Sequence, residues 1–243
     1  QTCALPIFQE RKLFHAEYAG KKQLTDEISE KLVRLYPELD ETEKAMINLF
    51  GISQYSTTEY AQTFFLGNNV NGEYAKNFLR ERSQLSSPYI FACLTQILKP
   101  WWIEVTNSKL FNVHSAVLPY ARGMYAIENI AILGDINKFK RTVGFTIHYI
   151  NEGVDLGAIV KSERIIDPFR FSSIWELKGY VYVTEFDAFV EFAKQIMGND
   201  ETIPAGIIHD PNLRGPNFKI GNFTPDKRRQ AEEGYLAMKN SLK

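Results

Sequence analysis

Apolar residues recur at helical spacing through the first third of the chain. Four of them lie three or four positions apart, with charged residues between them: Leu24, Ile28, Leu32 and Leu35. This spacing predicts an amphipathic helix. Asp40 and Glu43 have the separation of a capping box, which predicts the start of a second helix. Further helical patterns cover residues 58–65 and 73–82. We therefore expect residues 8–82 to form a helical cap or insertion.

Beyond this segment the pattern changes to short apolar runs bounded by turn-forming residues. Four runs have the length and composition of buried strands: 89–94, 109–113, 143–150 and 158–166. Helical patterns occupy residues 122–133 and 173–197, and Ser173 with Glu176 has the spacing of a capping box for the second. A charged helix is expected at residues 225–243. Strands that alternate with helices predict an α/β fold with a mostly parallel sheet flanked by helices.

Length and charge narrow the class of protein. The 243 residues suffice for one large domain or two small ones. The formal net charge of -1 gives no overall basic field for nucleic acid, and no apolar run is long enough to span a bilayer. We therefore expect no membrane partner. Two cysteines, Cys3 and Cys93, cannot by themselves supply a disulfide framework or a metal site, so we expect a reducing, cytoplasmic compartment and no metal.

The start of the chain affects how its domains are divided. The first seven residues, QTCALPI, resemble a translated sequencing adapter, and we expect residues 1–7 to be a non-native artefact. The expected division is then a helical segment at 8–82, a catalytic core at 83–203 and a C-terminal tail with a surface helix at 204–243.

Two polar residues stand at the end of an expected strand. Asn112 and His114 are two positions apart, so in an extended backbone they point to the same face. Asp155 lies in a glycine-flanked loop, which follows the strand that contains Thr146 and His148. An imidazole can hold or deliver a proton near neutral pH, a carboxylate can orient it, and a carboxamide can bind an oxyanion. Such a set suits acyl transfer.

Each of these residues also has an ordinary structural explanation. A single histidine such as His114 is more often a hydrogen-bonded core residue than a catalyst. Asn112 and Asp155 are common turn residues, and His148 in the middle of a strand fits a purely structural role. The residue types alone leave these alternatives open.

Two stretches carry a resemblance to a known family: FNVHSAVLPYARG at residues 111–123 and GFTIHYINEGVDLGAIV at residues 144–160. They resemble the folate-dependent formyltransferases, a family that includes glycinamide ribonucleotide, methionyl-tRNA and sugar-amine formyltransferases and formyltetrahydrofolate hydrolases. The family pairs Asn-x-His and Leu-Pro with a downstream Gly-x-Thr-x-His and Asp-x-Gly. The matching residues are Asn112, His114, Leu118, Pro119, Gly144, Thr146, His148, Asp155 and Gly157. The resemblance extends over residues 69–198.

The resemblance implies a Rossmann-like domain that binds 10-formyltetrahydrofolate as formyl donor. It implies that a substrate amine attacks the formyl carbon while Asn112 and protonated His114 stabilise the oxyanion. Asp155, the third catalytic residue, would hold His114 and help to move the proton. The residues implied to line the pterin pocket are Gln96, Ile97, Leu98, Ile150, Asn151, Glu152 and Gly153. Substrate contacts are implied for Glu185, His148 and Thr146.

The chain also departs from the family pattern. The family commonly has His-Pro-Ser, whereas Ser115 directly follows His114 here, which puts a role for that hydroxyl in doubt. No strand with a glycine- or serine-containing turn precedes Tyr89, so we expect the first βαβ unit to be missing. The tRNA-modifying members also carry a barrel-like domain, which we do not expect within these 243 residues. A small-molecule amine is therefore expected as acceptor, and tRNA is disfavoured.

Two alternative functions stay open from the sequence. A hydrolase would use the same three residues on water and release formate. A non-catalytic relative would bind folate or a protein partner. The oligomeric state is not predicted.

Overall fold

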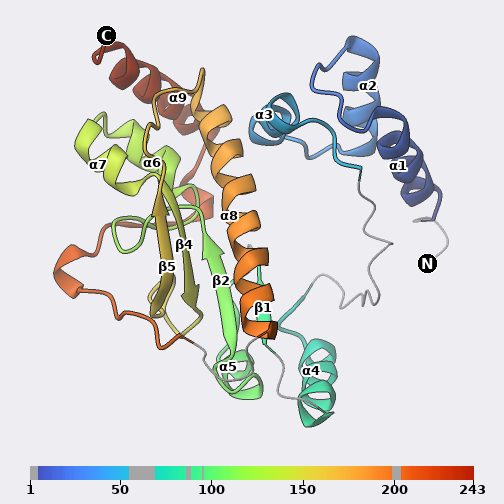
Figure 1. The fold of residues 1–243 in the computed structure, drawn as a ribbon, viewed down its shortest axis with the longest axis vertical. Helices are drawn as coiled ribbons and strands as arrows, with labels where there is room; N and C mark the ends of the chain where they lie inside the picture. Colours follow the sequence, from blue (N-terminus) through green and yellow to red (C-terminus); the bar gives the residue numbers. More distant parts are fainter. Residues whose placement is uncertain (1–4, 55–68, 86–88, 95, 199–203) are drawn as a thin grey trace. The chain divides into compact units, whose positions relative to one another are not determined.

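The structure is a computed structural model that describes residues 5–54, 69–85, 89–94, 96–198 and 204–243. The chain divides into two compact units (Figure 1). The first contains residues 1–65 and 175–180, and the second contains residues 66–174 and 181–243. The helix predicted at 58–65 lies outside the described residues.

The first unit is helical, as its sequence pattern predicts. It contains α1 (Leu5–Tyr18), α2 (Asp26–Leu35) and α3 (Glu41–Phe50). Their buried side chains form one apolar cluster: Phe14, Tyr18, Ile28, Leu32, Leu35 and Ile52. The predicted capping box at α3 is confirmed, because Asp40 accepts from the Glu43 N–H and the Glu43 side chain accepts from the Asp40 N–H. Arg11 joins α1 to the end of α2 by donating to the Leu35 carbonyl oxygen from Nε (2.9 Å) and Nη2 (2.6 Å).

The second unit is built around a mixed four-stranded sheet. Its strands are β1 (Ile90–Ala92), β2 (Leu110–His114), β4 (Gly144–Tyr149) and β5 (Ile159–Arg164), in the order β1-β2-β4-β5. The four predicted strands and the α/β class are confirmed. The prediction of a mostly parallel sheet is wrong for these strands, because only β1 and β2 are parallel, whereas β2–β4 and β4–β5 are antiparallel.

The connections explain the antiparallel pairs. Residues 150–158 join β4 to β5 without a helix, and a parallel crossover needs a dozen or more residues. Between β2 and β4 the chain forms α6 (Ala126–Ile132) and α7 (Ile136–Thr142). These helices return the chain to the edge where β2 ended, so that His114 pairs with Thr146 near the start of β4.

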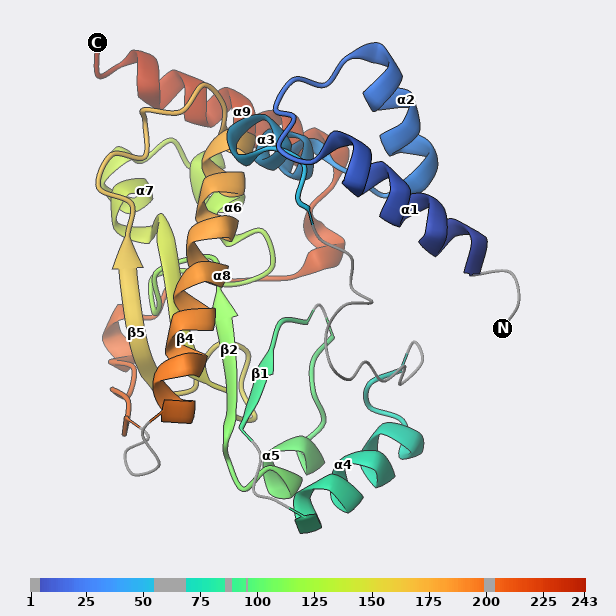
Figure 2. The ribbon, with the colours of Figure 1, turned by 45° about the vertical axis from the view of Figure 1, so that its right-hand side comes forward.

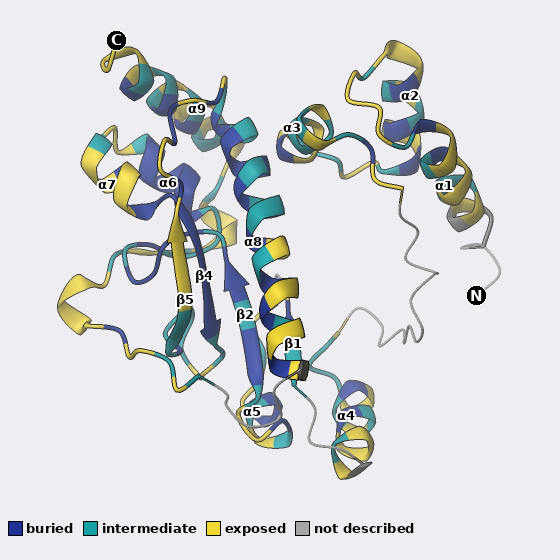
Figure 3. Ribbon diagram, in the orientation of Figure 1, coloured by how far each residue is buried: buried dark blue, intermediate teal, exposed yellow. Residues whose placement is uncertain are grey.

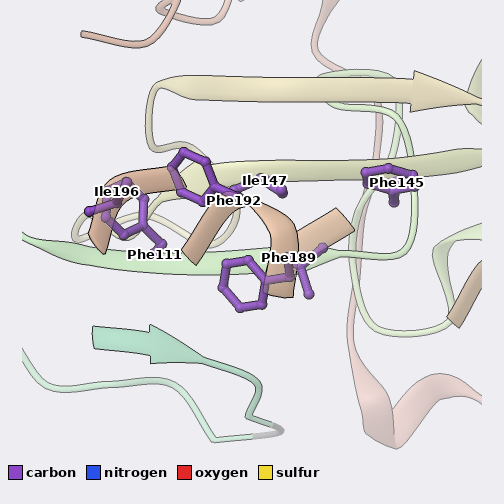
Figure 4. Packing of buried hydrophobic residues seen from close by; sticks show 7 residues of the cluster. Phe111, Phe145, Ile147, Phe189, Phe192 and Ile196 are labelled. Carbon is purple, nitrogen blue, oxygen red and sulfur yellow. The ribbon is translucent and has the colours of Figure 1, made fainter. Parts of the chain in front are cut away.

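One face of the sheet is covered by α8 (Ile174–Gly198), which confirms the helix predicted at 173–197. Figure 2 shows α8 in front of β4 and β2, running along them. Its residues Phe189, Phe192 and Ile196 pack against side chains of β2 and β4, as Figure 4 shows in close-up. The partners in the sheet are Phe111, Val113, Phe145 and Ile147. In Figure 3, β2 and β4 are mostly buried and the edge strand β5 is mostly exposed. The core therefore sits between α8 and the two central strands.

A second apolar cluster lies beside the first residue of β2. The helices α4 (Glu73–Leu85) and α5 (Trp101–Val105) supply most of it. Its buried residues are Ala75, Leu79, Ala92, Trp101, Trp102 and Leu110. The segment between β1 and α5 packs against this cluster through Leu98.

The C-terminal segment returns to the sheet before it forms its helix. Short helical turns cover Pro211–Leu213 and Ile220–Asn222, and α9 (Pro225–Asn240) confirms the charged helix predicted there. α9 packs against α6 so closely that a Cβ at Gly234 would collide with the Ala131 carbonyl oxygen. None of the described helices is long and apolar enough to cross a membrane.

The helix predicted at residues 122–133 begins later than expected. Arg122 and Gly123 form a two-residue strand, β3, that runs parallel to β6 (Asn217–Phe218). The helical part starts at Ala126. A distant segment of the chain therefore overrides the local helical pattern by supplying hydrogen-bond partners for an extended backbone. The capping box predicted for Ser173 and Glu176 stays a prediction; the Ile174 N–H donates to the Glu232 carboxylate of α9 (2.9 Å).

Candidate active site

The ends of β2 and β4 bring four polar residues together. Strand pairing places Asn112 opposite His148, and Asp155 reaches both strands from the loop after β4. His114 stands two residues beyond Asn112 on β2. The structure therefore gathers Asn112, His114 and Asp155 at one site, together with His148.

His148 is almost fully buried, and its hydrogen bonds define its tautomer. Nδ1–H donates to the Tyr149 carbonyl oxygen (2.7 Å), so Nε2 carries the lone pair in the neutral ring. The Asn112 Nδ2–H group donates to that lone pair (3.2 Å). Burial, aided by the nearby His114, lowers the pKa of His148 to about 4 despite the attraction of Asp155. A neutral His148 thus orients the Asn112 carboxamide and leaves its second N–H available.

His114 is also buried, and its two nitrogens face different partners. Nε2–H donates to the Ala121 carbonyl oxygen (3.2 Å). Nδ1 lies 3.6 Å from Asp155 Oδ2, which is longer than a good hydrogen bond. Nδ1 is therefore the nitrogen that can share a proton between Asp155 and a bound molecule.

Asp155 is held by a backbone donor as well as by the imidazoles. Its Oδ2 accepts from the Gly123 N–H (2.7 Å), and its Oδ1 lies 3.6 Å from His148 Nε2. Burial would raise the pKa of this carboxyl, but the combined effect of His114, His148, the Gly123 N–H and Arg122 lowers it. Asp155 is therefore a carboxylate at neutral pH.

Gly123 is required where it stands for two reasons. Its φ is +80°, in the region that favours glycine, and a Cβ would collide with the Phe218 carbonyl oxygen. The close approach of β6 thus leaves the Gly123 N–H pointing at Asp155. From the sequence Gly123 was expected only to turn the chain into the next helix, because its partner strand is almost a hundred residues away.

Thr146, for which a substrate contact was predicted, bonds the protein backbone. The side chain is fully buried, and its hydroxyl accepts from the Leu118 N–H (2.9 Å) and donates to the Ala116 carbonyl oxygen (2.9 Å). Ser162 Oγ lies 3.0 Å away on β5. Thr146 therefore fixes the turn that follows His114, and its hydroxyl already has both a backbone donor and a backbone acceptor.

The segments predicted to line a pterin pocket lie near each other. Leu98 and Ile150 both pack on the cluster around Trp101 and Trp102, whereas Ile97 is 74% exposed. Gln96 and Glu152 are exposed. In the loop after β4, Asn151 Oδ1 accepts from the Gly153 N–H (3.0 Å). The two segments therefore meet at the same apolar cluster.

A residue missed by the sequence analysis fixes the first of these segments. Asn71 Nδ2–H donates to the Ile97 carbonyl oxygen (2.9 Å), and Asn71 Oδ1 accepts from the Lys99 N–H (2.8 Å). The turn-rich composition around Asn71 was visible in the sequence, but its partner was not.

Glu185 of α8 lies close enough to Cys93, just after β1, to affect its titration. It is buried, and its charge adds to the effect of burial in raising the pKa of Cys93. Cys93 follows Ala92, which pairs with Asn112. Within the described part of the chain, no group of His, Cys, Asp and Glu side chains has the arrangement of a metal site.

Comparison with known proteins gives a consistent family. The family model described as formyl transferase matches residues 42–168, just over half of the chain. The trifunctional purine biosynthetic protein adenosine-3 of Chironomus tentans is 32% identical over 94 residues, which are 39% of this chain and 6% of that protein. Phosphoribosylglycinamide formyltransferase of Bacillus subtilis (strain 168) is 23% identical over 96 residues, which are 40% of this chain and 46% of that protein.

Among solved structures, the N-formyltransferase of Helicobacter canadensis, in complex with folinic acid and dTDP-3-aminofucose, is 19% identical with a TM-score of 0.49. The alignment covers 68% of this chain and 63% of that one. The chain spans less than half the length of the curated relatives it matches. Because the family model covers Asn112, His114, Asp155 and more than half of the sequence, the chain belongs to the formyl transferase family.

Proposed function

We propose that this chain transfers a formyl group from 10-formyltetrahydrofolate to an amine. The observation that carries the proposal is the convergence of Asn112, His114 and an ionised Asp155 within the segment that matches the family. Together they provide a neutral hydrogen-bond donor, an imidazole and a carboxylate at one place, which formyl transfer to an amine requires.

The chemistry of the site fits such a donor. When bound, 10-formyltetrahydrofolate supplies an electrophilic formyl carbon and a nitrogen leaving group. Ile97, Leu98 and Ile150 would provide apolar contacts for its ring system. The exposure of Ile97 supports this assignment, since an apolar side chain held outward by the Asn71 hydrogen bonds is ready for a planar ligand.

Asn112 and His114 act on the oxygen of the formyl group. The Asn112 N–H that is not bonded to His148 donates to this oxygen as negative charge develops on it. Protonated His114 donates from Nδ1, because its Nε2–H is already bonded to Ala121. Neither group has to reorganise greatly, because both already have a fixed partner on their other side.

Asp155 acts on the proton of the attacking amine. An amine that forms a bond to carbon becomes acidic and must lose a proton. The Asp155 carboxylate is ionised and lies 3.6 Å from His114 Nδ1, so it can accept this proton. The proton leaves with the nitrogen of the departing tetrahydrofolate.

The proposal is tested by incubating the 243-residue chain with 10-formyltetrahydrofolate and a panel of primary amines. The panel contains glycinamide ribonucleotide and several amino-sugar nucleotides, and formylated products are identified by mass spectrometry. We expect formylation of at least one amine, and we expect His114→Ala and Asp155→Ala to lose most of the activity.

Two results would contradict the proposal. Formate release at the same rate with and without any amine would identify a hydrolase. Wild-type rates in both variants would show that the site described above is not the reacting one.

A further inference from the structure

The loop that carries Asp155 is held by side chains from two other parts of the chain. Arg122 of β3 donates from Nη1 to the Val154 carbonyl oxygen (3.4 Å), one residue before Asp155. His209 of the C-terminal segment donates from Nε2 to the Gly157 carbonyl oxygen (2.9 Å), two residues after it. Both acceptors are backbone atoms, so these bonds fix the path of the loop on either side of the carboxylate.

The backbone at Asp155 needs such restraint. Its φ is +49°, in the left-handed region, which costs an L-residue about 1 kcal/mol or more. A conformation of this kind persists when its surroundings determine it. The orientation of the Asp155 carboxylate toward the Gly123 N–H and the two imidazoles depends on the backbone conformation of this loop.

The C-terminal segment that supplies His209 is itself anchored on both sides. Ile207 forms two backbone hydrogen bonds with Ile159 of β5 (2.8 and 2.7 Å). The Gly215 N–H donates to the Pro119 carbonyl oxygen (2.8 Å). Arg122 Nη2 also donates to the Gly215 carbonyl oxygen (3.4 Å), so one guanidinium contacts both the loop and this segment.

Arg122 and His209 act on Asp155 in different ways. The guanidinium of Arg122 is one of the charges that lower the pKa of Asp155. Burial, followed by the charges of Arg214 and Arg122, lowers the pKa of His209, so its ring is neutral at neutral pH. Arg122 therefore acts by charge and by position, whereas His209 acts by position alone.

The remaining nitrogens of the two side chains make no hydrogen bond to another described residue. Arg122 Nε and His209 Nδ1 are buried and have no hydrogen-bond partner among the described residues. A substitution at either position therefore changes the contacts with the loop and the C-terminal segment and disturbs no further described hydrogen bond.

We propose that Arg122 and His209 are positioning residues that clamp the Asp155 loop in its left-handed conformation, and that residues 207–218 thereby form part of the active site. The catalytic consequence rests on the proposed function. The structural consequence can be measured without any activity.

Amide hydrogen exchange at Gly123 reports the position of the carboxylate, because the Gly123 N–H donates to Asp155 Oδ2. His209→Leu removes the ring donor and retains apolar volume, and His209→Gln retains a donor of similar reach. In the full chain at neutral pH we expect Gly123 to lose protection at least about tenfold in His209→Leu and to keep it in His209→Gln. The amides of β4 are the reference for global stability and should not change.

The kinetic arm measures formyl transfer by the same variants. Misplacement of a catalytic group by about 1 Å can lower the rate about a hundredfold. We expect kcat to fall about ten- to a hundredfold in His209→Leu, KM for the donor to change less than about threefold, and His209→Gln to restore kcat. His15→Leu is the matched control, since His15 bonds a backbone carbonyl oxygen in the first unit (Ser53, 2.8 Å), and it should leave both readouts unchanged.

The outcomes separate the two proposals. Absence of formyl transfer in the wild type refutes the proposed function. Hydrogen exchange of the Gly123 amide then still tests whether Arg122 and His209 hold the Asp155 loop. Unchanged Gly123 protection in His209→Leu, or an equal loss in His209→Gln, overturns the clamp. If His209→Leu does not fold, Gly123 protection is compared between Arg122→Met and Arg122→Lys, and the same outcomes support or overturn the proposal.

Discussion

His148 makes the stability of the second unit depend on pH. Its folded-state pKa is about 4, compared with 6.5 for a free histidine. Between these values the unfolded chain binds one more proton at this position than the folded chain does. The contribution of His148 to stability is therefore fully present above pH 6.5, is lost progressively as the pH falls, and levels off below pH 4.

The size of this effect follows from the two pKa values. The difference between 6.5 and about 4 corresponds to about 3 kcal/mol of unfolding free energy. The structure supplies the cause: protonation would put a charge on a side chain that is 2% exposed, and it would place an Nε2–H opposite the Asn112 N–H. Two donors would then face each other at 3.2 Å, and the carboxamide would lose its orientation.

The assay compares the wild type with His148→Asn, which cannot titrate. Urea unfolding is followed at several pH values, and the difference between the two free energies removes the contributions of the titrating groups that do not interact with His148. We expect the stability advantage of the wild type to shrink by about 3 kcal/mol between pH 7 and pH 4. Parallel curves for the two proteins, or an NMR titration of the His148 ring with a midpoint near 6.5, would refute the reasoning.

Three further predictions follow from the contacts described above. Gly234→Ala should lower the unfolding free energy by about 1–3 kcal/mol because its Cβ meets the Ala131 carbonyl oxygen, whereas Gly221→Ala, which meets open space, should stay within about 0.5 kcal/mol in thermal unfolding. Thr146→Val should cost about 1–3 kcal/mol by leaving buried backbone groups unpaired, while KM stays at the wild-type value. Asn112→Asp should lower kcat at least about a hundredfold by replacing an N–H donor with a negative charge, and a normal kcat would contradict its assigned role.

The residues of the site could be predicted from the sequence where local strand geometry or a local motif was sufficient. The spacing of Asn112 and His114 on a strand places both side chains on one face. The family motif then adds Asp155 and Gly157. The motif also pointed to Thr146, whose buried hydroxyl bonds the backbone at Ala116 and Leu118. A motif indicates which residue type is present and leaves open whether the residue acts on a substrate or on the backbone beside it.

The parts that could not be predicted depend on distant contacts. Arg122 was assigned to a helix because nothing nearby reveals the strand at residues 217–218 that pairs with it. His209 lies in a segment rich in turn residues, without a periodic pattern. The antiparallel pairing of β4 and β5 could have been predicted, because the nine residues 150–158 are too few for a crossover helix.

We propose that an ionised Asp155 drives formyl transfer at this site. The most direct measurement is the single-turnover rate of formyl transfer by Asp155→Asn, which keeps the shape of the side chain and an oxygen acceptor for the Gly123 N–H while it removes the charge. We predict a rate at least about a hundredfold below that of the wild type, with binding of the donor unchanged. A single-turnover rate equal to that of the wild type would contradict the account.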